Sequence, residues 1–456
     1  MINSSRLIKN SISNIVNGFA TSLMSVAITP FLYEILTKDE FSIWSVTIQL
    51  GILINVAATS LQVSVGRFVS YRSNSLSKSV NSMFRFQQLA FCLILLSTLF
   101  ISLLSINYGW LIQNYQAITD TLPNASWSIS IVCFSYMLNI FGGYFTGVFI
   151  GKEKNEIPAL VNVAFKFILG VVLVNVAHYG LLAMSLSFFV INIFSYLVLC
   201  YLSPSYIKFI FIRCAKKVIN SFPELNNEEW RYYYGVFVLN FSTFLVSGIG
   251  VLIISKYDYE HVANYSVAMS LVGLISGAMS TILSPLIQPL THLYKTGDEN
   301  GISKVFKIVT ISICIIIPFS VLVSLYIGEF LFDILTNRDN STEVSSMFSA
   351  LLLVYLIRSI GVPFGLVLLA KAKHSNIMLF PFVEGALCFG FSLLFINVFS
   401  VGWLSIVYAV ALSALIIMAI YCFFLLRRNI EVNLFFAVII YVVFPLLMIW
   451  LFLFNS

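Results

Sequence analysis

The chain has 456 residues, of which 59% are hydrophobic and only 10% are charged. A soluble globular protein is about 45–50% apolar and about 25% charged. The composition therefore excludes a water-soluble enzyme, a disordered chain and a nucleic-acid-binding protein, and it predicts an all-α polytopic membrane protein.

Apolar runs long enough to span a bilayer follow one another along the whole chain. A spanning helix needs about 20 mostly apolar residues. The runs are continuous, whereas the strands of a transmembrane barrel alternate in polarity, so helices are favoured. We predict about thirteen spans, at 12–36, 41–66, 86–108, 126–150, 157–177, 181–202, 233–255, 262–290, 305–328, 347–370, 377–397, 402–426 and 432–453.

The Lys and Arg residues predict the orientation of these spans. Twenty of the 25 lie before the first run or in loops that follow even-numbered runs, whereas Lys38, Lys256 and Arg338 lie on the other side. Basic loops stay in the cytoplasm, so we expect a cytoplasmic N-terminus and, with thirteen spans, an external C-terminus. The net charge of +6 then reflects topology and not a nucleic-acid partner.

An internal repeat predicts the domain organisation. With a shift of 219 residues, the stretch 136–154 matches 355–373, including the short basic loop at its end. The shift covers six spans, so both copies have the same orientation, as in transporters built from parallel halves. We predict an N-terminal six-helix bundle (1–202), a cytoplasmic amphipathic linker that binds anionic membrane lipids (203–232), a C-terminal six-helix bundle (233–426) and an additional transmembrane helix (427–456).

Three charged residues, Lys166, Arg358 and Glu384, lie well inside predicted spans. A charge at the bilayer centre costs roughly 2.5–3.5 kcal/mol, so such residues face protein or water and mark either a pathway or a buried pair. In the repeat, Lys166 falls beside Glu384 and Arg358 falls on Asn139, while Asn162 lies one helical turn from Lys166. If the halves face each other, we expect these positions to line one central cavity.

Such a cavity would favour an anionic substrate. A guanidinium presents a bidentate fork that suits phosphate or pyrophosphate, and Arg67 would add positive charge at the cytoplasmic rim. Glu384 would pair with Lys166 or Arg358 when substrate is absent, or instead carry a proton or bind a cation.

Helix breakers and small residues predict where helices bend or approach closely. Pro285 and Pro289 lie one turn apart in the span 262–290, where each removes a backbone hydrogen bond and kinks the helix. We interpret them as a gating hinge or as a fixed bend. Gly142, Gly143 and Gly147 in the span 126–150 permit close helix contact.

The remaining residues predict no cofactor, metal centre or catalytic residue. The four His residues are dispersed and the seven Cys residues form no CxxC pair. The chain also has no Walker loop and no GxSxG motif.

The first 72 residues resemble a known family. They contain NSISNIVNGF, ITPFLYEILTKDEFSIWSV and SVGRFVSYR. Together with the repeat, these segments resemble the polysaccharide-transporter branch of the multidrug/oligosaccharidyl-lipid/polysaccharide (MOP) exporter superfamily and, more narrowly, Wzx-type O-antigen flippases. Pro30, Ile43, Trp44 and Arg67 match the family pattern, and Ser42 departs from it at a position where Gly is frequent.

The resemblance implies a protein of the bacterial inner membrane that acts in lipopolysaccharide biosynthesis. It implies flipping of an undecaprenyl-pyrophosphate-linked oligosaccharide, the repeat unit of O antigen or a related surface polysaccharide, from the cytoplasmic to the periplasmic leaflet. Alternating access, coupled to H+ or Na+, is the implied mechanism. Lys166 and Arg358 would hold phosphate, Arg67 would attract it at the entrance and Glu384 would couple the ion. A polysaccharide polymerase and a chain-length regulator are the implied protein partners.

Two alternatives stay open. A multidrug or cation antiporter of the same fold would be expected to hold a buried acidic residue in its first bundle, where Glu34 lies only near a helix end. A membrane-embedded polysaccharide polymerase or ligase is the enzyme alternative, but the acidic residues are scattered and the longest loop, 203–232, has about 30 residues.

Overall fold

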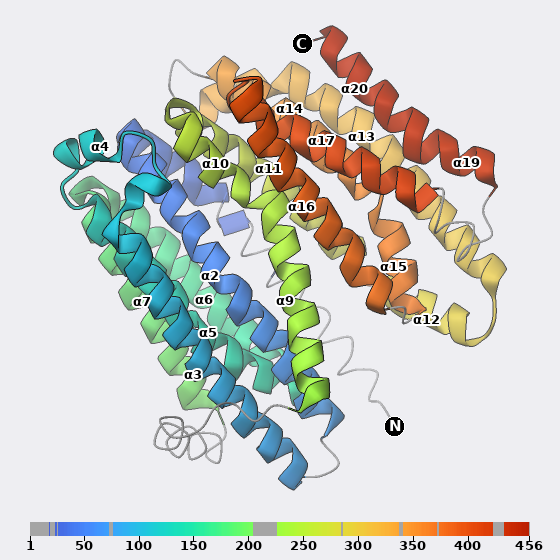
Figure 1. Cartoon of the computed structure of the whole chain (residues 1–456), viewed down its shortest axis with the longest axis horizontal. Coiled ribbons are helices and arrows are strands. Elements are labelled where there is room, and N and C mark those ends of the chain that lie inside the picture. Colours follow the sequence, from blue (N-terminus) through green and yellow to red (C-terminus); the bar gives the residue numbers. More distant parts are fainter. Residues whose placement is uncertain are drawn as a thin grey trace. The chain divides into compact units, whose positions relative to one another are not determined.

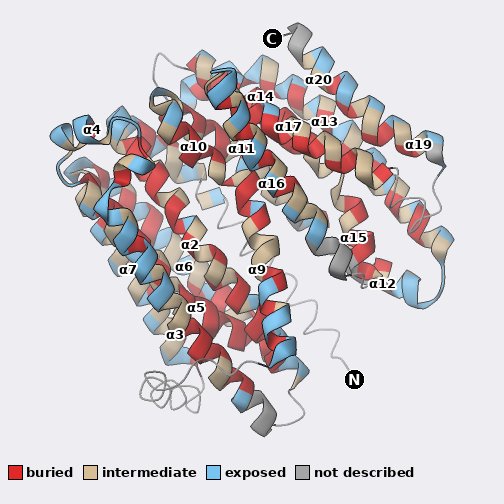
Figure 2. Ribbon diagram, in the orientation of Figure 1, coloured by how far each residue is buried: buried red, intermediate tan, exposed pale blue. Residues whose placement is uncertain are grey.

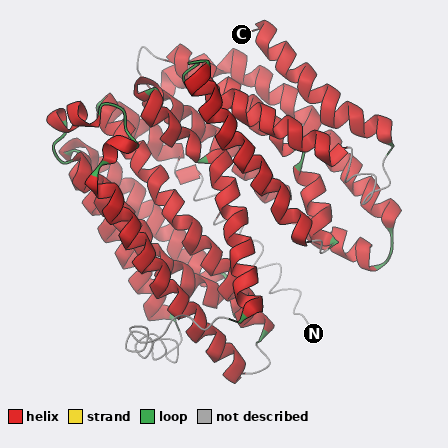
Figure 3. Ribbon diagram, viewed as in Figure 1, coloured by secondary structure: helices red, strands yellow, loops and turns green. Residues whose placement is uncertain are grey.

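The computed structural model describes residues 18, 23–24, 26–72, 76–203, 226–283, 286–336, 341–371, 374–422 and 433–455. Within these ranges the chain is helical and contains no strand (Figure 3). Among the described residues, ten apolar helices are long enough to cross a membrane, or eleven if a bent helix pair counts as one span, and the helices Val26–Ile35 and Leu404–Ile420 are shorter. Together they coincide with the predicted runs, which confirms an all-helical, multi-pass membrane protein.

The described helices divide into two compact units. Unit 1 extends to Ile28 and resumes over Ile35–Phe244, and unit 2 contains Thr29–Glu34 and the chain from Leu245 onward. The helices of each unit are labelled in Figure 1.

Unit 1 contains five long helices and the first part of a sixth. They are α2 (Lys38–Tyr71), α3 (Leu76–Ile106), α5 (Ala125–Gly151), α6 (Glu156–Val176), α7 (Leu181–Leu202) and α9 (Asn227–Ser247) up to Phe244, with the short elements η1 (Tyr108–Trp110), α4 (Tyr115–Thr121) and η2 (Ala177–Tyr179) between them.

Unit 2 contains the later spans and a short amphipathic helix. Its elements are α10 (Ile249–Tyr257), η4 (Tyr259–His261), α11 (Val262–Leu283), α12 (Ile287–Lys295), α13 (Glu299–Thr336), α14 (Ser341–Ser359), α15 (Val362–Ala370), α16 (His374–Val398), α17 (Leu404–Ile420), α19 (Leu434–Val438), the π-helical turn η7 (Ile439–Val443) and α20 (Phe444–Asn455).

The close packing of α2 on α5 forms the centre of unit 1, and Figure 2 shows buried residues along both helices. A Cβ atom on Gly143 would lie 2.7 Å from the carbonyl oxygen of Ala58, and one on Gly147 would lie 2.5 Å from that of Gln62. Only glycine permits backbones to approach this closely. The two glycines therefore allow the helix contact that the sequence predicts.

A capping box defines the beginning of α2. The Thr37 hydroxyl accepts a hydrogen bond from the backbone N–H of Glu40, and the Glu40 carboxylate accepts one from the backbone N–H of Thr37. These two bonds satisfy N–H groups that a helix start leaves without partners. The box explains how the short turn after the first span leads directly into a 34-residue helix.

The helices α9 and α10 are separated by a short break and are long and apolar enough for one span only when taken together. The break follows Ser247, and α10 starts after Gly248. The repeat places this whole span in the second bundle, whereas packing assigns α9 up to Phe244 to unit 1. Of the predicted linker 203–232, residues 204–225 lie outside the described residues.

Candidate functional site

Arg358 and Glu384 form an ion pair within unit 2. Arg358 Nε donates to Glu384 Oε1 at 2.6 Å, and Arg358 Nη2 donates to Oε2 at 3.3 Å, so α14 and α16 are joined by a two-pronged contact. The Glu384 side chain is only 10% exposed, whereas that of Arg358 is 29% exposed. The guanidinium is therefore the partner that a ligand reaches more readily.

Aromatic side chains surround this pair. Tyr355, one turn before Arg358, donates its hydroxyl to the backbone oxygen of Val246 at 2.8 Å. The Tyr421 ring packs on Phe364 with a centroid distance of 4.7 Å.

Lys166 is the charged residue in the middle of α6, in unit 1. Its side chain is half-buried, as is that of Asn162 one turn earlier. Among the described residues, neither side chain has a hydrogen-bond or ion-pair partner within reach. The described acidic residues of unit 1 lie in loops, at helix starts or, for Asp120, near the end of the short helix α4, so no described carboxylate of this unit pairs with the Lys166 amine.

Uncharged polar side chains connect three helices of unit 1. Asn139 on α5 donates its amide to the Asn55 oxygen on α2 at 2.6 Å. Asn240 on α9 donates to the Ser60 hydroxyl, also on α2, at 3.0 Å. These contacts satisfy polar groups that would be costly to bury alone in a membrane span.

Arg67 is exposed on the last part of α2, and its guanidinium carbon lies 4.1 Å from the centroid of the Tyr232 ring. This cation–π contact orients the side chain without neutralising its charge.

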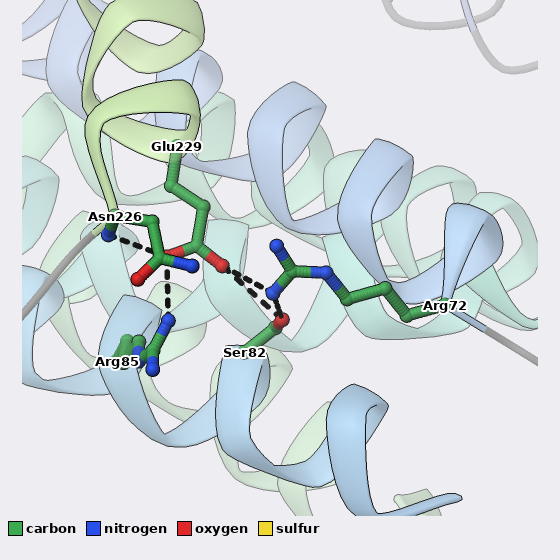
Figure 4. A network of polar contacts seen from close by, with 5 residues as sticks. All are labelled: Arg72, Ser82, Arg85, Asn226 and Glu229. Atoms are coloured by element: carbon green, nitrogen blue, oxygen red, sulfur yellow. Dashed lines mark hydrogen bonds and ion pairs between the residues drawn. The ribbon is translucent and has the colours of Figure 1, made fainter. Parts of the chain in front are cut away.

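Glu229, a buried carboxylate near Arg67, is not among the residues that the sequence singles out. Glu229, at the start of α9, is 0% exposed. Its Oε1 accepts from Arg72 Nη1 at 2.5 Å and from Ser82 Oγ at 3.2 Å, and its Oε2 accepts from the Asn226 backbone N–H at 3.0 Å. Arg85 Nη1 lies 3.4 Å from the same Oε2 (Figure 4). Arg72 also donates to the Ser82 hydroxyl. We call these five residues the Glu229 cluster.

A second polar chain runs through unit 2. Tyr33 donates to the Asn264 side-chain oxygen at 2.7 Å, and Asn264 donates to Glu343 Oε2 at 2.8 Å. His261 lies between two carboxylates, with Nε2 3.3 Å from Glu343 Oε1 and Nδ1 2.5 Å from Asp258 Oδ1. The chain holds Tyr33, in the stretch Thr29–Glu34, against η4, α11 and α14.

The structure brings together only some of the residues that the sequence singles out. Arg358 and Glu384 meet in unit 2, whereas Lys166, Asn162, Asn139 and Arg67 belong to unit 1. The shared cavity stays a prediction.

The predicted hinge is described only in part. Pro285 lies outside the described residues, and Pro289 is the third residue of α12. Proline is tolerated in a first turn because the N–H it lacks has no helical partner there. A role in gating also stays a prediction. Within the described ranges, no group of three or more His, Cys, Asp or Glu side chains is placed to hold a metal ion.

The chain resembles solved structures, although its sequence has no match. No family model matches the chain, and no curated protein sequence matches it. An inward-facing multidrug resistance MATE family transporter of the MOP superfamily is similar over 89% of this chain and 92% of its own, with a TM-score of 0.64 and 12% identity.

Two further structures agree over almost their whole length. An outward-facing multidrug resistance MATE family transporter of the MOP superfamily has a TM-score of 0.61 at 10% identity, and covers 98% of this chain and 96% of its own. The lipid II flippase MurJ, in an inward closed conformation, has a TM-score of 0.59 at 14% identity and covers 98% of both chains. The chain therefore has the fold of MOP superfamily transporters, as the sequence resemblance implied.

Proposed function

We propose that the chain is a transporter that flips an undecaprenyl-pyrophosphate-linked oligosaccharide between membrane leaflets by alternating access. The observation that carries this proposal is Lys166, a cation in the middle of a span of unit 1 with no acidic partner among the described residues. A positive charge held in a membrane is stabilised by a substrate that brings negative charge with it.

We assign the Arg358–Glu384 pair a second role in the same transport process, in which pyrophosphate and the Glu384 carboxylate exchange on Arg358. A pyrophosphate group offers more oxygens and more charge than one carboxylate, so it competes with Glu384 for the Arg358 guanidinium. When substrate leaves, Glu384 takes its place and keeps Arg358 from remaining an uncompensated charge in the membrane. Glu384, once released, is available to take up a proton or a cation.

The fold supports a transport function but does not identify the substrate. MurJ is named as a lipid II flippase, and the MATE proteins are named as multidrug transporters. The specific observation that favours a multidrug or cation antiporter is the Glu384 carboxylate, which lies within a span and is itself a ligand for cations. We favour the lipid-linked substrate because Arg358 already neutralises Glu384, whereas no described residue neutralises Lys166.

Binding to the purified protein separates the two functions. In nanodiscs of zwitterionic lipid, Lys166→Ala should weaken binding of undecaprenyl pyrophosphate by about 10- to 100-fold, which corresponds to one lost charge-assisted contact. Lys166→Arg should retain most of the affinity. Lys154→Ala, which removes an exposed Lys from the same unit, is the matched control and should bind normally.

The Glu384→Gln variant gives opposite results under the two functions. If Glu384 competes with an anion for Arg358, the variant binds undecaprenyl pyrophosphate more tightly. If Glu384 binds a cationic drug, the variant loses affinity for ethidium and gains nothing toward pyrophosphate. Ethidium binding that depends on Glu384, together with normal anion binding by Lys166→Ala, would overturn the flippase proposal.

A further inference from the structure

The Glu229 cluster has the chemistry of a phosphate-binding site that a carboxylate occupies. Two guanidinium groups, one hydroxyl and one backbone N–H surround the two Glu229 oxygens. These donor types are the ones that bind phosphate in proteins, and guanidinium binds it best because it offers several N–H groups in a fixed geometry.

The charges of the cluster do not balance. Arg72 and Arg85 bring two positive charges and Glu229 brings one negative charge, so one positive charge remains. Each arginine uses only Nη1 to contact Glu229, although a guanidinium has five N–H donors. A phosphate group, with more oxygens and more charge, would therefore engage donors that the carboxylate leaves unused.

The two arginines are within reach of a ligand. Their side chains are 15% and 28% exposed, whereas the Glu229 side chain between them is fully buried. Arg67 extends the basic surface, because its guanidinium lies over Tyr232, whose ring packs edge-on against Phe68 at 5.8 Å. Arg72 lies over the same Phe68 ring, 5.2 Å from its centroid.

We propose that the Glu229 cluster is a binding site for a phosphate or pyrophosphate group, and that Glu229 occupies this site until such a group displaces it. Displacement releases the first turn of α9 from α2 and α3. The Lys and Arg distribution predicts that this end of unit 1 is cytoplasmic, and the headgroup of the lipid-linked substrate would first be available there. Only this identification of the natural ligand rests on the proposed function.

Competition by Glu229 and a purely structural role of Glu229 predict opposite changes in the affinity for an anion. A group that occupies a site within the same chain lowers the apparent affinity for an external ligand in proportion to the fraction of time the site is open. Removing the Glu229 charge should therefore strengthen anion binding. If Glu229 only fastens α9, its removal disturbs the site and weakens binding.

The experiment uses the full chain in nanodiscs of zwitterionic lipid. Glu229→Gln should bind pyrophosphate about tenfold or more tightly than the natural chain, as expected if Glu229 occupies the site at least about nine-tenths of the time. Glu228→Gln, which removes an exposed carboxylate from the adjacent position, is the matched control and should bind as the natural chain does. Arg85→Gln, which leaves the Arg72–Glu229 contact in place, should lose binding.

Thermal stability gives a second readout that does not depend on measuring affinity. Glu229→Gln leaves two arginines without their carboxylate, so its melting temperature should be lower than that of the natural chain. Millimolar inorganic pyrophosphate should restore that loss, and equimolar chloride should not. Hydrogen exchange in the peptide 226–234 of the natural chain should increase when ligand displaces Glu229.

Separate arms identify the source of the phosphate group. Inorganic pyrophosphate, undecaprenyl pyrophosphate and phosphatidic acid are each added to the same nanodiscs, and binding of any of them with the expected Glu229→Gln gain supports the site. Equal or weaker binding by Glu229→Gln, with no recovery of its melting temperature, overturns the proposal. None of these readouts involves transport or Lys166, so failure of the flippase proposal would leave them unchanged.

Discussion

Removing Arg358 alone should destabilise the protein more than removing the whole Arg358–Glu384 pair. The variant Arg358→Met leaves the Glu384 carboxylate, which is 10% exposed, without a positive partner. Breaking a buried pair in this way costs about 3–5 kcal/mol. Because the Arg358 side chain is 29% exposed, water partly solvates the pair, and we expect about 3 kcal/mol.

Removing the carboxylate should lower the free energy of unfolding by less than removing the guanidinium does. Glu384→Gln leaves a guanidinium that already has access to solvent and whose long side chain can move its charge outward. The double variant contains no unpaired charge, so its loss should be about 1–2 kcal/mol. The coupling free energy from the double-mutant cycle should then be about 2 kcal/mol.

Reversible unfolding in mixed detergent micelles, followed by circular dichroism, measures all four free energies of unfolding. A coupling energy near zero, with Arg358→Met no less stable than the double variant, would show that the ion pair does not organise this part of unit 2. The natural chain and Glu384→Gln also serve in the binding measurements proposed above.

Three further predictions concern packing, polar contacts and phenotype. Gly147→Ala should cost about 1–3 kcal/mol because the new methyl group meets the Gln62 carbonyl oxygen. Gly365→Ala, with open space around its Cβ position, should be stabilising by up to about 1 kcal/mol because alanine is the better helix former. A stabilising effect of both substitutions would exclude the close helix approach. Tyr33→Phe removes the hydrogen bond to Asn264 and should cost about 1 kcal/mol with increased hydrogen exchange over residues 29–34, and unchanged exchange would contradict this role. The flippase proposal predicts that deletion of the gene traps single lipid-linked repeat units on the cytoplasmic side, whereas display of single units outside the cell would favour a polymerase.

The spans were predictable because each is a continuous apolar run. The capping box of Thr37 and Glu40 was not singled out in the sequence, although both residues are close together along the chain. The packing of the helices against one another was harder to predict from the sequence. The repeat associates α9 with the second bundle, yet the bonds of Glu229 to Arg72 and Arg85 hold its start in unit 1. These partners are 157 and 144 residues away in sequence, and nothing in a single sequence specifies such a pairing.

The sequence singles out the charged residues of the candidate site but does not show their contacts. Charges inside apolar runs marked Lys166, Arg358 and Glu384, because each is costly in a bilayer. The sequence allowed Glu384 to pair with Lys166 or with Arg358, and the 2.6 Å contact identifies Arg358 in this structure. Asp258 lies only three residues before His261, but Glu343, the second carboxylate beside His261, comes from α14, and the sequence does not reveal that contact.

A flipping assay tests the central proposal most directly. Purified protein is reconstituted into liposomes that carry a fluorescent undecaprenyl-pyrophosphate-linked oligosaccharide, and an impermeant reagent measures how much label changes leaflet. The proposal predicts movement with the natural chain and with Lys154→Ala, and a loss of about tenfold or more with Lys166→Ala. Equal movement by Lys166→Ala and the natural chain, or transport of ethidium with no movement of the lipid, would contradict it.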